Sequence, residues 1–379
     1  MACWTGLVVG WLVLVYMVNA LPNIPVEDLL KPLPVVIWHG LGDSAYSPFL
    51  LGIKDDIQKM YPGIYVHLVA IEPSLFADQR ATIFGNVNCQ INKVHRQLSQ
   101  IPELQHGFDA VGFSQGGQFL RGYVERFNSP RVRNLITFGS QHMGITNVRK
   151  CAPMDAICHT VHGILMGGVY TDYAQNSVVT AQYFRDTRTK QQFDLYQHRN
   201  HFLHDINNEG IERNATYKAN LQRLDKFVMI KFTEESTVIP AASSWFEACV
   251  DPDHREGFTD RIVPLRSTDL YQEDWIGLRA LDRKGALTFQ ECEGHHMNID
   301  SECFVRIFGQ HVGRPLITRP WTLNWQDRVQ NQLGMTKSMI VLSGFLVFVL
   351  CVRLFRRRSL GKIGAIHLDD KPQEEMRTI

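Results

Sequence analysis

The amino-acid sequence predicts an α/β fold with a mainly parallel central sheet. Short apolar runs alternate with helical stretches along most of the chain, which is the pattern of strands joined by helical crossovers. The motif Gly-Phe-Ser-Gln-Gly at 112–116 lies directly between one such run and a helical stretch. With 379 residues and 45% hydrophobic content, the chain is long enough to fold as one large domain that carries an insertion.

The predicted strands are short apolar runs bounded by turn-forming residues. The first, at 35–38, lies between Pro34 and the pair His39-Gly40, as expected of a buried parallel strand. The others follow in chain order at 65–69, 109–113, 135–138 and 227–232, with a weaker last member at 287–289. Helical periodicity is present between strands at 81–98 and 118–127.

The interval 148–223 interrupts this alternation. A connection of that length between two strands must have structure of its own, so we expect a lid-like helical insertion over the strand ends, after the half of the fold that carries the 112–116 motif. The interval contains the scattered aromatic residues Tyr170, Tyr173, Tyr183, Phe184, Phe193, Tyr196 and Phe202. We expect most of them to form a small core of the insertion, and the alternative is that they line a surface for a hydrophobic substrate.

The motif at 112–116 is typical of a nucleophile elbow. A strand that reverses sharply into a helix forces a strained backbone at the central residue, and side chains at the flanking positions would collide across the turn. Glycine at 112 and 116 avoids that collision and leaves the hydroxyl of Ser114 open. The pattern alone is weak because glycine and serine are common, but the flanking strand and helix favour a nucleophile over a plain loop.

A serine hydroxyl is a poor nucleophile until a base accepts its proton, so the chain must also supply a histidine that an acid orients. In the α/β-hydrolase fold these residues follow the serine in the order acid, histidine. The strand at 227–232 precedes two glutamates at 234–235, and the last strand precedes Glu-Gly-His-His at 293–296. From these residues alone, His295 and His296 are equally well placed as the base.

An oxyanion hole needs two backbone donors aimed at the carbonyl oxygen on which charge develops. One donor is expected from the amide of Gln115, next to the nucleophile. The second is expected from the glycine-rich loop at 39–43, in which Leu41 is best placed. We expect His39 and Asp43 to anchor this loop rather than to take part in the chemistry.

Longer runs of the sequence resemble the palmitoyl-protein thioesterase family, in particular its lysosomal type. The matching runs are 37–44, 62–66, 112–121, 226–229 and 293–296. The resemblance extends from about residue 33 to about residue 308. It implies an α/β-hydrolase fold for this stretch of the chain.

The resemblance also implies an activity and a set of site residues. The activity is hydrolysis by an active-site serine that removes long-chain fatty acyl groups, mainly palmitate, from cysteine thioesters of proteins or peptides through an acyl-enzyme. Ser114 would be the nucleophile and His296 the base, with Leu41 and Gln115 in the oxyanion hole. No metal and no cofactor is implied. Two alternatives stay open: a lipase or esterase acting on oxygen esters, and a non-catalytic acyl-binding membrane protein.

The acid departs from the family pattern. The family has an aspartate in the loop after the strand that ends near 232, whereas this sequence has Glu235, followed by Ser-Thr-Val. Glutamate is one methylene longer, but it can still accept the imidazole N–H, as in Ser-His-Glu triads. We therefore predict a catalytic triad of Ser114, Glu235 and His296.

Both ends of the chain carry apolar segments. Residues 1–20 end in Val-Asn-Ala and are typical of a secretory signal peptide, with an uncleaved anchor as the alternative because no lysine or arginine precedes the apolar run. A second segment at 336–355 has the length of a transmembrane helix, with a buried core helix as the alternative. Three arginines at 356–358 mark the cytosolic side of that segment.

These segments predict the domain organisation. We expect a luminal thioesterase domain at 21–320, a single membrane-spanning helix at 336–355 and a cytosolic tail at 356–379. The family resemblance implies residence in the lysosome. The partners expected are S-acylated proteins or peptides, a long-chain acyl group, and the membrane through the C-terminal helix.

A luminal location favours disulfides among the six cysteines that lie between the two apolar segments. They are Cys89, Cys151, Cys158, Cys249, Cys292 and Cys303. Cys151 and Cys158 match a family disulfide, while spacing does not reveal how the other four pair. Asn214 begins a glycosylation sequon. With 39 basic and 38 acidic residues, the charge balance argues against nucleic acid as a partner.

Overall fold

The computed structural model describes residues 31–147, 159, 162, 163, 165, 167–249 and 262–314. The predicted signal peptide at 1–20, the segment at 336–355 and the tail at 356–379 lie outside these residues, as do Cys151 and Cys158. Within the described ranges, no helix is both long enough and apolar enough to cross a membrane.

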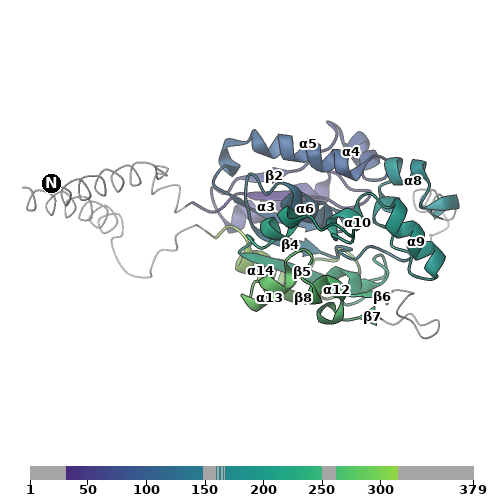
Figure 1. Cartoon of the computed structure of the whole chain (residues 1–379). Coiled ribbons are helices and arrows are strands. Elements are labelled where there is room, and N and C mark those ends of the chain that lie inside the picture. Colours follow the sequence, from purple (N-terminus) through teal and green to yellow (C-terminus); the bar gives the residue numbers. More distant parts are fainter. Residues whose placement is uncertain are drawn as a thin grey trace, which may run out of the picture. The chain divides into compact units, whose positions relative to one another are not determined.

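Six parallel strands form the central sheet in the order β2-β1-β3-β4-β5-β8 (Figure 1). They are β1 (Val35–Trp38), β2 (Val66–Leu68), β3 (Phe108–Phe113), β4 (Val132–Phe138), β5 (Lys226–Phe232) and β8 (Leu287–Cys292). The predicted parallel α/β sheet is thus confirmed. A separate antiparallel pair consists of β6 (Ala248–Cys249) and β7 (Ile262–Val263).

Helices cover both faces of this sheet, which explains why its central strands are continuous apolar runs. On one face lie α3 (Pro48–Met60) and α14 (Ser301–His311), and on the other lie α5 (Val87–Ser99) and α6 (Gln115–Arg126) (Figure 1). Side chains of β3 alternate between them, so that Ala110 joins the α5–α6 core and Val111 the α3–α14 core.

The remaining helices are short. The α-helices are α4 (Leu75–Ala81), α8 (Asp172–Ser177), α9 (Lys190–Arg199), α10 (Leu203–Ile206), α11 (Ala215–Leu221), α12 (Asp269–Gln272) and α13 (Leu278–Arg283). Single 3-10 turns occur at Pro102–Leu104, Thr180–Tyr183, Ala241–Trp245 and Leu265–Ser267.

Three elements differ from the expected bounds. Of the stretch at 81–98, residues 87–98 belong to α5, while α4 ends at Ala81. Between the two helices lies Gly85, whose φ of 145° is a conformation that glycine adopts readily. Helix α6 begins directly after Ser114 instead of at 118. Strand β8 extends to Cys292, and its apolar signal is weak because it is an edge strand whose residues are mostly half exposed.

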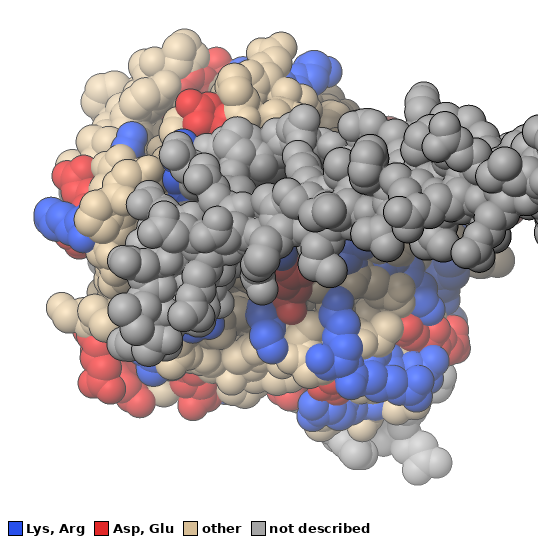
Figure 2. Space-filling view, turned by 90° about the vertical axis from the view of Figure 1, so that its left-hand side faces the viewer, with Lys and Arg blue, Asp and Glu red and all other residues tan. Residues whose placement is uncertain are grey.

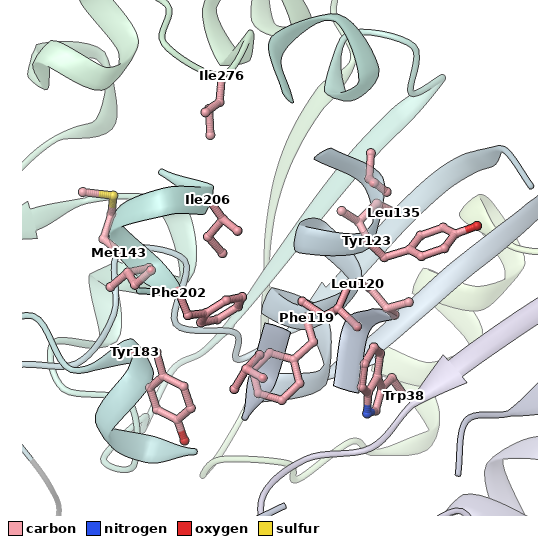
Figure 3. Packing of buried hydrophobic residues seen from close by; sticks show 14 of the residues in the cluster. Trp38, Phe119, Leu120, Tyr123, Leu135, Met143, Tyr183, Phe202, Ile206 and Ile276 are labelled. Carbon is pink, nitrogen blue, oxygen red and sulfur yellow. The ribbon is translucent and has the colours of Figure 1, made fainter. Parts of the chain in front are cut away.

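The described part of the interval 148–223 contains α8 to α11, and its aromatic residues join the main core. The ring of Phe202 meets Phe119 of α6 edge-on at 5.6 Å, and Figure 3 shows the two side by side. Tyr183 and Tyr196 belong to the same buried cluster, whereas Tyr173 is 65% exposed. The expectation of a separate small core was therefore wrong, because α6 packs directly against this region.

The topology places two loops at one point of the sheet. Strands β1 and β3 are neighbours in the sheet. After β1 the chain runs to β2 on one side, and after β3 it runs to β4 on the other side. In open α/β sheets the loops at such a switch point separate and leave a crevice at the carboxyl ends of the strands. Here those are the loop after β1 and the turn at Ser114.

The first and last residues of the described domain lie at the amino-terminal ends of the strands, opposite the crevice. Leu33 and Arg314 line one cleft together with Asn134 and Lys226, near the starts of β4 and β5. The amide of Gly313 also donates a hydrogen bond to the buried carboxylate of Asp109 in β3. Figure 2 looks onto this end of the molecule, where acidic side chains lie among the basic ones.

Candidate active site

Ser114 occupies a strained turn between β3 and α6. Its φ of 52° and ψ of −124° are unusual for a residue other than glycine, as the predicted elbow requires. A Cβ atom at residue 116 would lie 2.3 Å from the carbonyl oxygen of Trp38, and one at residue 112 would lie 2.1 Å from the Cα atom of Gly117. Only glycine fits at these two positions, so the backbone keeps Ser114 at the head of α6.

His296 lies beside Ser114. Its Nε2 atom is 3.1 Å from the Ser114 hydroxyl oxygen, a hydrogen-bond distance. The ring packs edge-on against Phe232 at the end of β5, with 5.9 Å between ring centroids. Gly139 makes room for it, since a Cβ atom there would lie 2.9 Å from the imidazole. The ring is thus held where it can accept the Ser114 proton.

Glu235 orients His296 from the loop after β5. Its Oε2 atom is 2.5 Å from Nδ1 of His296, and its side chain is fully buried. The other carboxylate oxygen accepts hydrogen bonds from the amides of Thr237 and Val238, at 2.7 and 3.0 Å. Burial by itself raises the pKa of Glu235, but the His296 contact and the two amides together lower it below its ordinary value.

The neighbouring histidine and glutamate make a separate contact. His295 Nε2 lies 3.1 Å from the Glu234 carboxylate, and both side chains are more than 60% exposed. The adjacency of two histidines, which left the base undecided from the residues alone, is thus resolved by geometry: of the two, His296 is the one that meets Ser114.

The loop after β1 runs directly over the nucleophile. A Cβ atom at residue 40 would lie 3.0 Å from Cβ of Ser114, so the glycine allows close approach. Within the described ranges, the amides of Leu41 and Gln115 donate to no other residue. Leu41 and Gln115 directly follow the two residues of this close contact, and two free backbone amides are what an oxyanion hole requires.

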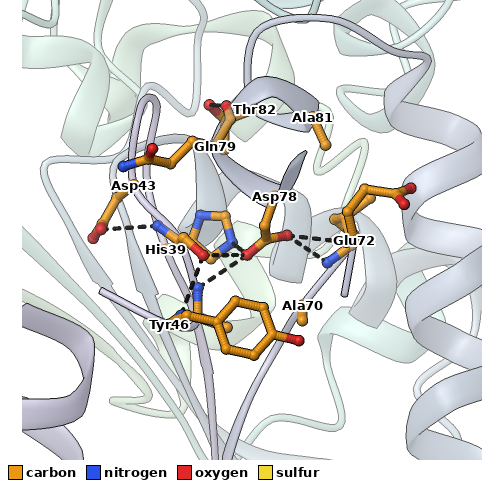
Figure 4. Close-up of polar contacts among 12 residues, drawn as sticks. His39, Asp43, Tyr46, Ala70, Glu72, Asp78, Gln79, Ala81 and Thr82 are labelled. Atoms are coloured by element: carbon orange, nitrogen blue, oxygen red, sulfur yellow. Dashed lines mark hydrogen bonds and ion pairs between the residues drawn. The ribbon is translucent and has the colours of Figure 1, made fainter. Parts of the chain in front are cut away.

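Asp78 is a site residue that the sequence did not reveal. It is fully buried on α4, and its carboxylate lies 3.1 Å from Nε2 of His39 at the start of the loop after β1 (Figure 4). The expected anchoring role of His39 is thereby explained. No motif surrounds Asp78, so nothing in the sequence distinguishes it from the other acidic residues.

A disulfide joins the loop that carries His296 to α14. Cys292 ends β8 and Cys303 lies in the first turn of α14, with 5.7 Å between their Cα atoms. Cys89 is exposed and unpaired. Asn214, the predicted glycosylation site, is exposed and caps α11 through its side-chain oxygen. Among the residues that the structure describes, no group of histidine, cysteine and acidic side chains could hold a metal ion.

The sequence is similar to a known enzyme family over most of the described domain. The family model "Palmitoyl protein thioesterase" matches residues 34–296. The chain is 36% identical over 280 residues to palmitoyl-protein thioesterase 1 of Caenorhabditis elegans, covering 74% of this chain and 91% of the relative. It is 34% identical over 260 residues to palmitoyl-protein thioesterase 3 of Dictyostelium discoideum, covering 68% and 82%.

More distant relatives and solved structures extend this comparison. The lysosomal thioesterase PPT2-B of Xenopus laevis is 26% identical over 286 residues, covering 71% of this chain and 88% of the relative. Among solved structures, the RedJ thioesterase of Streptomyces coelicolor aligns with 75% of this chain and 90% of its own at a TM-score of 0.37 and 14% identity.

Proposed function

The chain belongs to the palmitoyl protein thioesterase family, and from that membership we propose that it hydrolyses palmitoyl thioesters of cysteine in proteins or peptides. It is a thioesterase of the α/β-hydrolase fold. The observation that supports the chemistry best is the continuous hydrogen-bonded path from Ser114 through His296 to Glu235, with contacts of 3.1 and 2.5 Å.

The proposed reaction has two halves. Ser114 Oγ attacks the thioester carbonyl carbon while His296 Nε2 takes the hydroxyl proton, and the amides of Leu41 and Gln115 stabilise the negative oxygen. The tetrahedral intermediate breaks its C–S bond, and the cysteine sulfur leaves with the proton from His296. Because a cysteine thiol has a pKa of about 8.5, the sulfur is a better leaving group than an alkoxide.

Water completes the cycle in the second half. His296 removes a proton from water as the water oxygen attacks the acyl-Ser114 carbonyl. The second tetrahedral intermediate then breaks its bond to the Ser114 oxygen, which takes the proton from His296, and the fatty acid is released. Glu235 holds the imidazole in the required tautomer throughout and stabilises the imidazolium form. The lowered pKa of Glu235 favours the ionised form of this carboxylate.

An apolar surface near the site suits a long acyl chain. The loop after β1 exposes Leu41 and Tyr46, and the first turn of α3 exposes Phe49, each by roughly two fifths of its surface. Phe49 also packs edge-on against Phe113, the residue before the nucleophile, at 5.5 Å. Each methylene that a bound chain buries contributes about 0.8 kcal/mol.

The test compares a palmitoyl-cysteine peptide with the matching palmitoyl oxygen ester, using the purified full-length protein. We expect faster turnover of the thioester, and labelling of Ser114 by a fluorophosphonate probe that is lost in Ser114→Ala and strongly reduced in His296→Ala. A preference for the oxygen ester would favour a lipase or esterase. Absence of labelling and of turnover would favour an acyl-binding protein without catalysis.

We further propose that the domain lies in the lumen of the lysosome or secretory pathway and that 336–355 anchors it there. Relatives named lysosomal thioesterases and the disulfide between Cys292 and Cys303 support the lumen. The apolar sequence at 336–355 and the arginines after it support the anchor. Alkaline extraction of membranes tests it, because a protein without an anchor would be released into the supernatant.

A further inference from the structure

One short segment of the chain contacts both parts of the oxyanion hole. The segment 78–82 comprises the end of α4 and Thr82, and we call it the oxyanion brace. We propose that the oxyanion brace sets the distance between the amides of Leu41 and Gln115, so that Asp78 and Thr82 are positioning residues for acyl transfer. This inference rests on the proposed function of Ser114, and it concerns residues that touch neither substrate nor nucleophile.

Asp78 holds the loop after β1 at three points. Its Oδ2 atom accepts a hydrogen bond from the hydroxyl of Ser44 at 2.9 Å and another from the amide of Ala45 at 3.0 Å, and it lies 3.1 Å from Nε2 of His39 (Figure 4). His39, Ser44 and Asp78 are all at least 99% buried. These contacts fix the loop on both sides of Leu41, because the anchored residues precede and follow it in the sequence.

The second oxygen of Asp78 fixes α4 to the sheet. Oδ1 accepts hydrogen bonds from the amides of Ile71 and Glu72, at 2.7 and 3.1 Å, in the segment that follows β2 (Figure 4). The hydroxyl of Ser44 and the amides of Ala45, Ile71 and Glu72 all donate to this carboxylate. Burial raises the pKa of Asp78, but His39 and the surrounding amides outweigh it and lower the pKa to about 2. An asparagine here would direct its NH2 group at one set of donors and lose their hydrogen bonds.

Thr82 connects the loop to the second donor. Its hydroxyl accepts a hydrogen bond from the amide of Gly42 at 2.8 Å, directly after Leu41, and donates one to the carbonyl of Gln79 at 2.6 Å. Its carbonyl accepts a hydrogen bond from the side-chain amide of Gln115 at 3.1 Å. The side chain of Gln115 is fixed from its other end by the hydroxyl of Tyr183, at 3.0 Å.

The arrangement has a direct kinetic consequence. An oxyanion donor is effective only when it lies about 2.7–3.1 Å from the charged oxygen, and removal of one donor costs about 10²–10³ in kcat. Leu41 lies in an irregular loop with no strand or helix to hold its amide. The oxyanion brace supplies that rigidity, since it is bonded to residues 42 and 115 at once.

The experiment uses the full-length protein and two ligands, one that forms an oxyanion in the hole and one that does not. A long-chain trifluoromethyl ketone takes the Ser114 oxygen onto its carbonyl carbon, and the proton passes to His296, leaving an alkoxide in the hole. A peptide with S-hexadecyl cysteine, a thioether, has the same chain but no carbonyl oxygen. The variants are Asp78→Asn, the isosteric Thr82→Val and its partner Thr82→Ser, which keeps the hydroxyl.

We expect Asp78→Asn to lower kcat on a palmitoyl-cysteine peptide about 100-fold and to raise the inhibition constant of the ketone by a similar factor. Thr82→Val should change both about tenfold in the same directions, and Thr82→Ser should restore both to within about twofold. KM and the affinity for the thioether should stay within about twofold in every variant. Asp109→Asn makes the same substitution at another buried carboxyl, at the start of β3, and is the matched control for replacing a buried aspartate.

Two results would overturn the inference. One is that Asp78→Asn and Thr82→Val keep kcat and ketone affinity within threefold of the parent protein. The other is that they weaken the thioether as much as the ketone, which indicates general damage to the site. If Asp78→Asn fails to fold, the Thr82→Val and Thr82→Ser pair decides. If the parent protein itself neither hydrolyses the thioester nor binds the ketone, the proposed function fails instead.

Discussion

Glu235 stands where the sequence resemblance leads us to expect an aspartate. Its longer side chain is folded back so that one oxygen faces His296 and the other accepts two amides of its own loop. The hydrogen bonds from these amides hold the longer side chain close to the loop backbone. The substitution therefore keeps the geometry that an imidazole needs for its N–H hydrogen bond.

We expect Glu235→Gln to reduce kcat by about 10³–10⁴, since the amide no longer stabilises the imidazolium and favours the wrong tautomer. Glu234→Gln is the matched control, because Glu234 is exposed and its carboxylate lies beside the exposed His295. It should change kcat by less than about twofold. Steady-state rates on a palmitoyl-cysteine peptide measure both, and equal losses in the two variants would mean that Glu235 is not the acid.

At the scale of single elements, the junction of β3 and α6 depends on close backbone contact. Gly116→Ala would place a methyl group 2.3 Å from the Trp38 carbonyl oxygen, and neither neighbour can move without displacing the sheet. We expect destabilisation by more than about 3 kcal/mol, or no folding. Thermal unfolding measures the effect.

The control for that change is Gly52→Ala within α3. No atom lies within 4 Å of the added methyl group, and alanine favours a helix interior over glycine by about 1 kcal/mol. The control should therefore stabilise the protein slightly. A Gly116→Ala protein as stable as the parent would contradict the packing described for the elbow.

The disulfide between β8 and α14 constrains the loop that carries His296. Closing a loop with a sequence separation of 11 stabilises a protein by about 3 kcal/mol in the chain-entropy model. We expect the double variant Cys292→Ser, Cys303→Ser to lose about that much stability. Cys89→Ser, which changes an exposed and unpaired cysteine, should leave the unfolding temperature unchanged. An unaltered unfolding temperature of the double variant would argue against the bond.

At the scale of the whole molecule, one buried carboxyl links stability to pH. Asp109 is fully buried at the start of β3, and burial raises its pKa from 3.8 to about 7. The folded protein thus keeps this proton up to about pH 7, whereas the unfolded chain loses it near pH 4. Stability should fall as pH rises between those values, by at most roughly 4 kcal/mol at 1.36 kcal/mol per pH unit.

Asp109→Asn should remove this dependence, because its side chain is neutral at every pH. Thermal unfolding of the parent and the variant at pH 5 and pH 7.5 checks the sign. The parent should lose stability relative to the variant at the higher pH. A parent protein that gains stability relative to Asp109→Asn on going to pH 7.5 would show that Asp109 is ionised when folded.

Much of this architecture could be predicted because the central strands are buried on both faces and therefore consist of apolar runs. The elbow could also be recognised from the sequence, because its glycines avoid steric overlap between residues that are close together in the chain. Contacts between distant segments left no such signal. Asp78 meets its partners only after β1, β2 and α4 have come together, and the pairing of Cys292 with Cys303 depends on where α14 begins.

The positions of Leu33 and Arg314 at the amino-terminal edge of the sheet have a practical consequence. The catalytic serine follows the carboxyl end of β3, on the far side of the strands from both residues. A bead or sensor chip coupled beside Leu33 or Arg314 would therefore lie on the side of the sheet opposite Ser114. Bulky fusion partners joined there should leave the entry of large acylated molecules unobstructed.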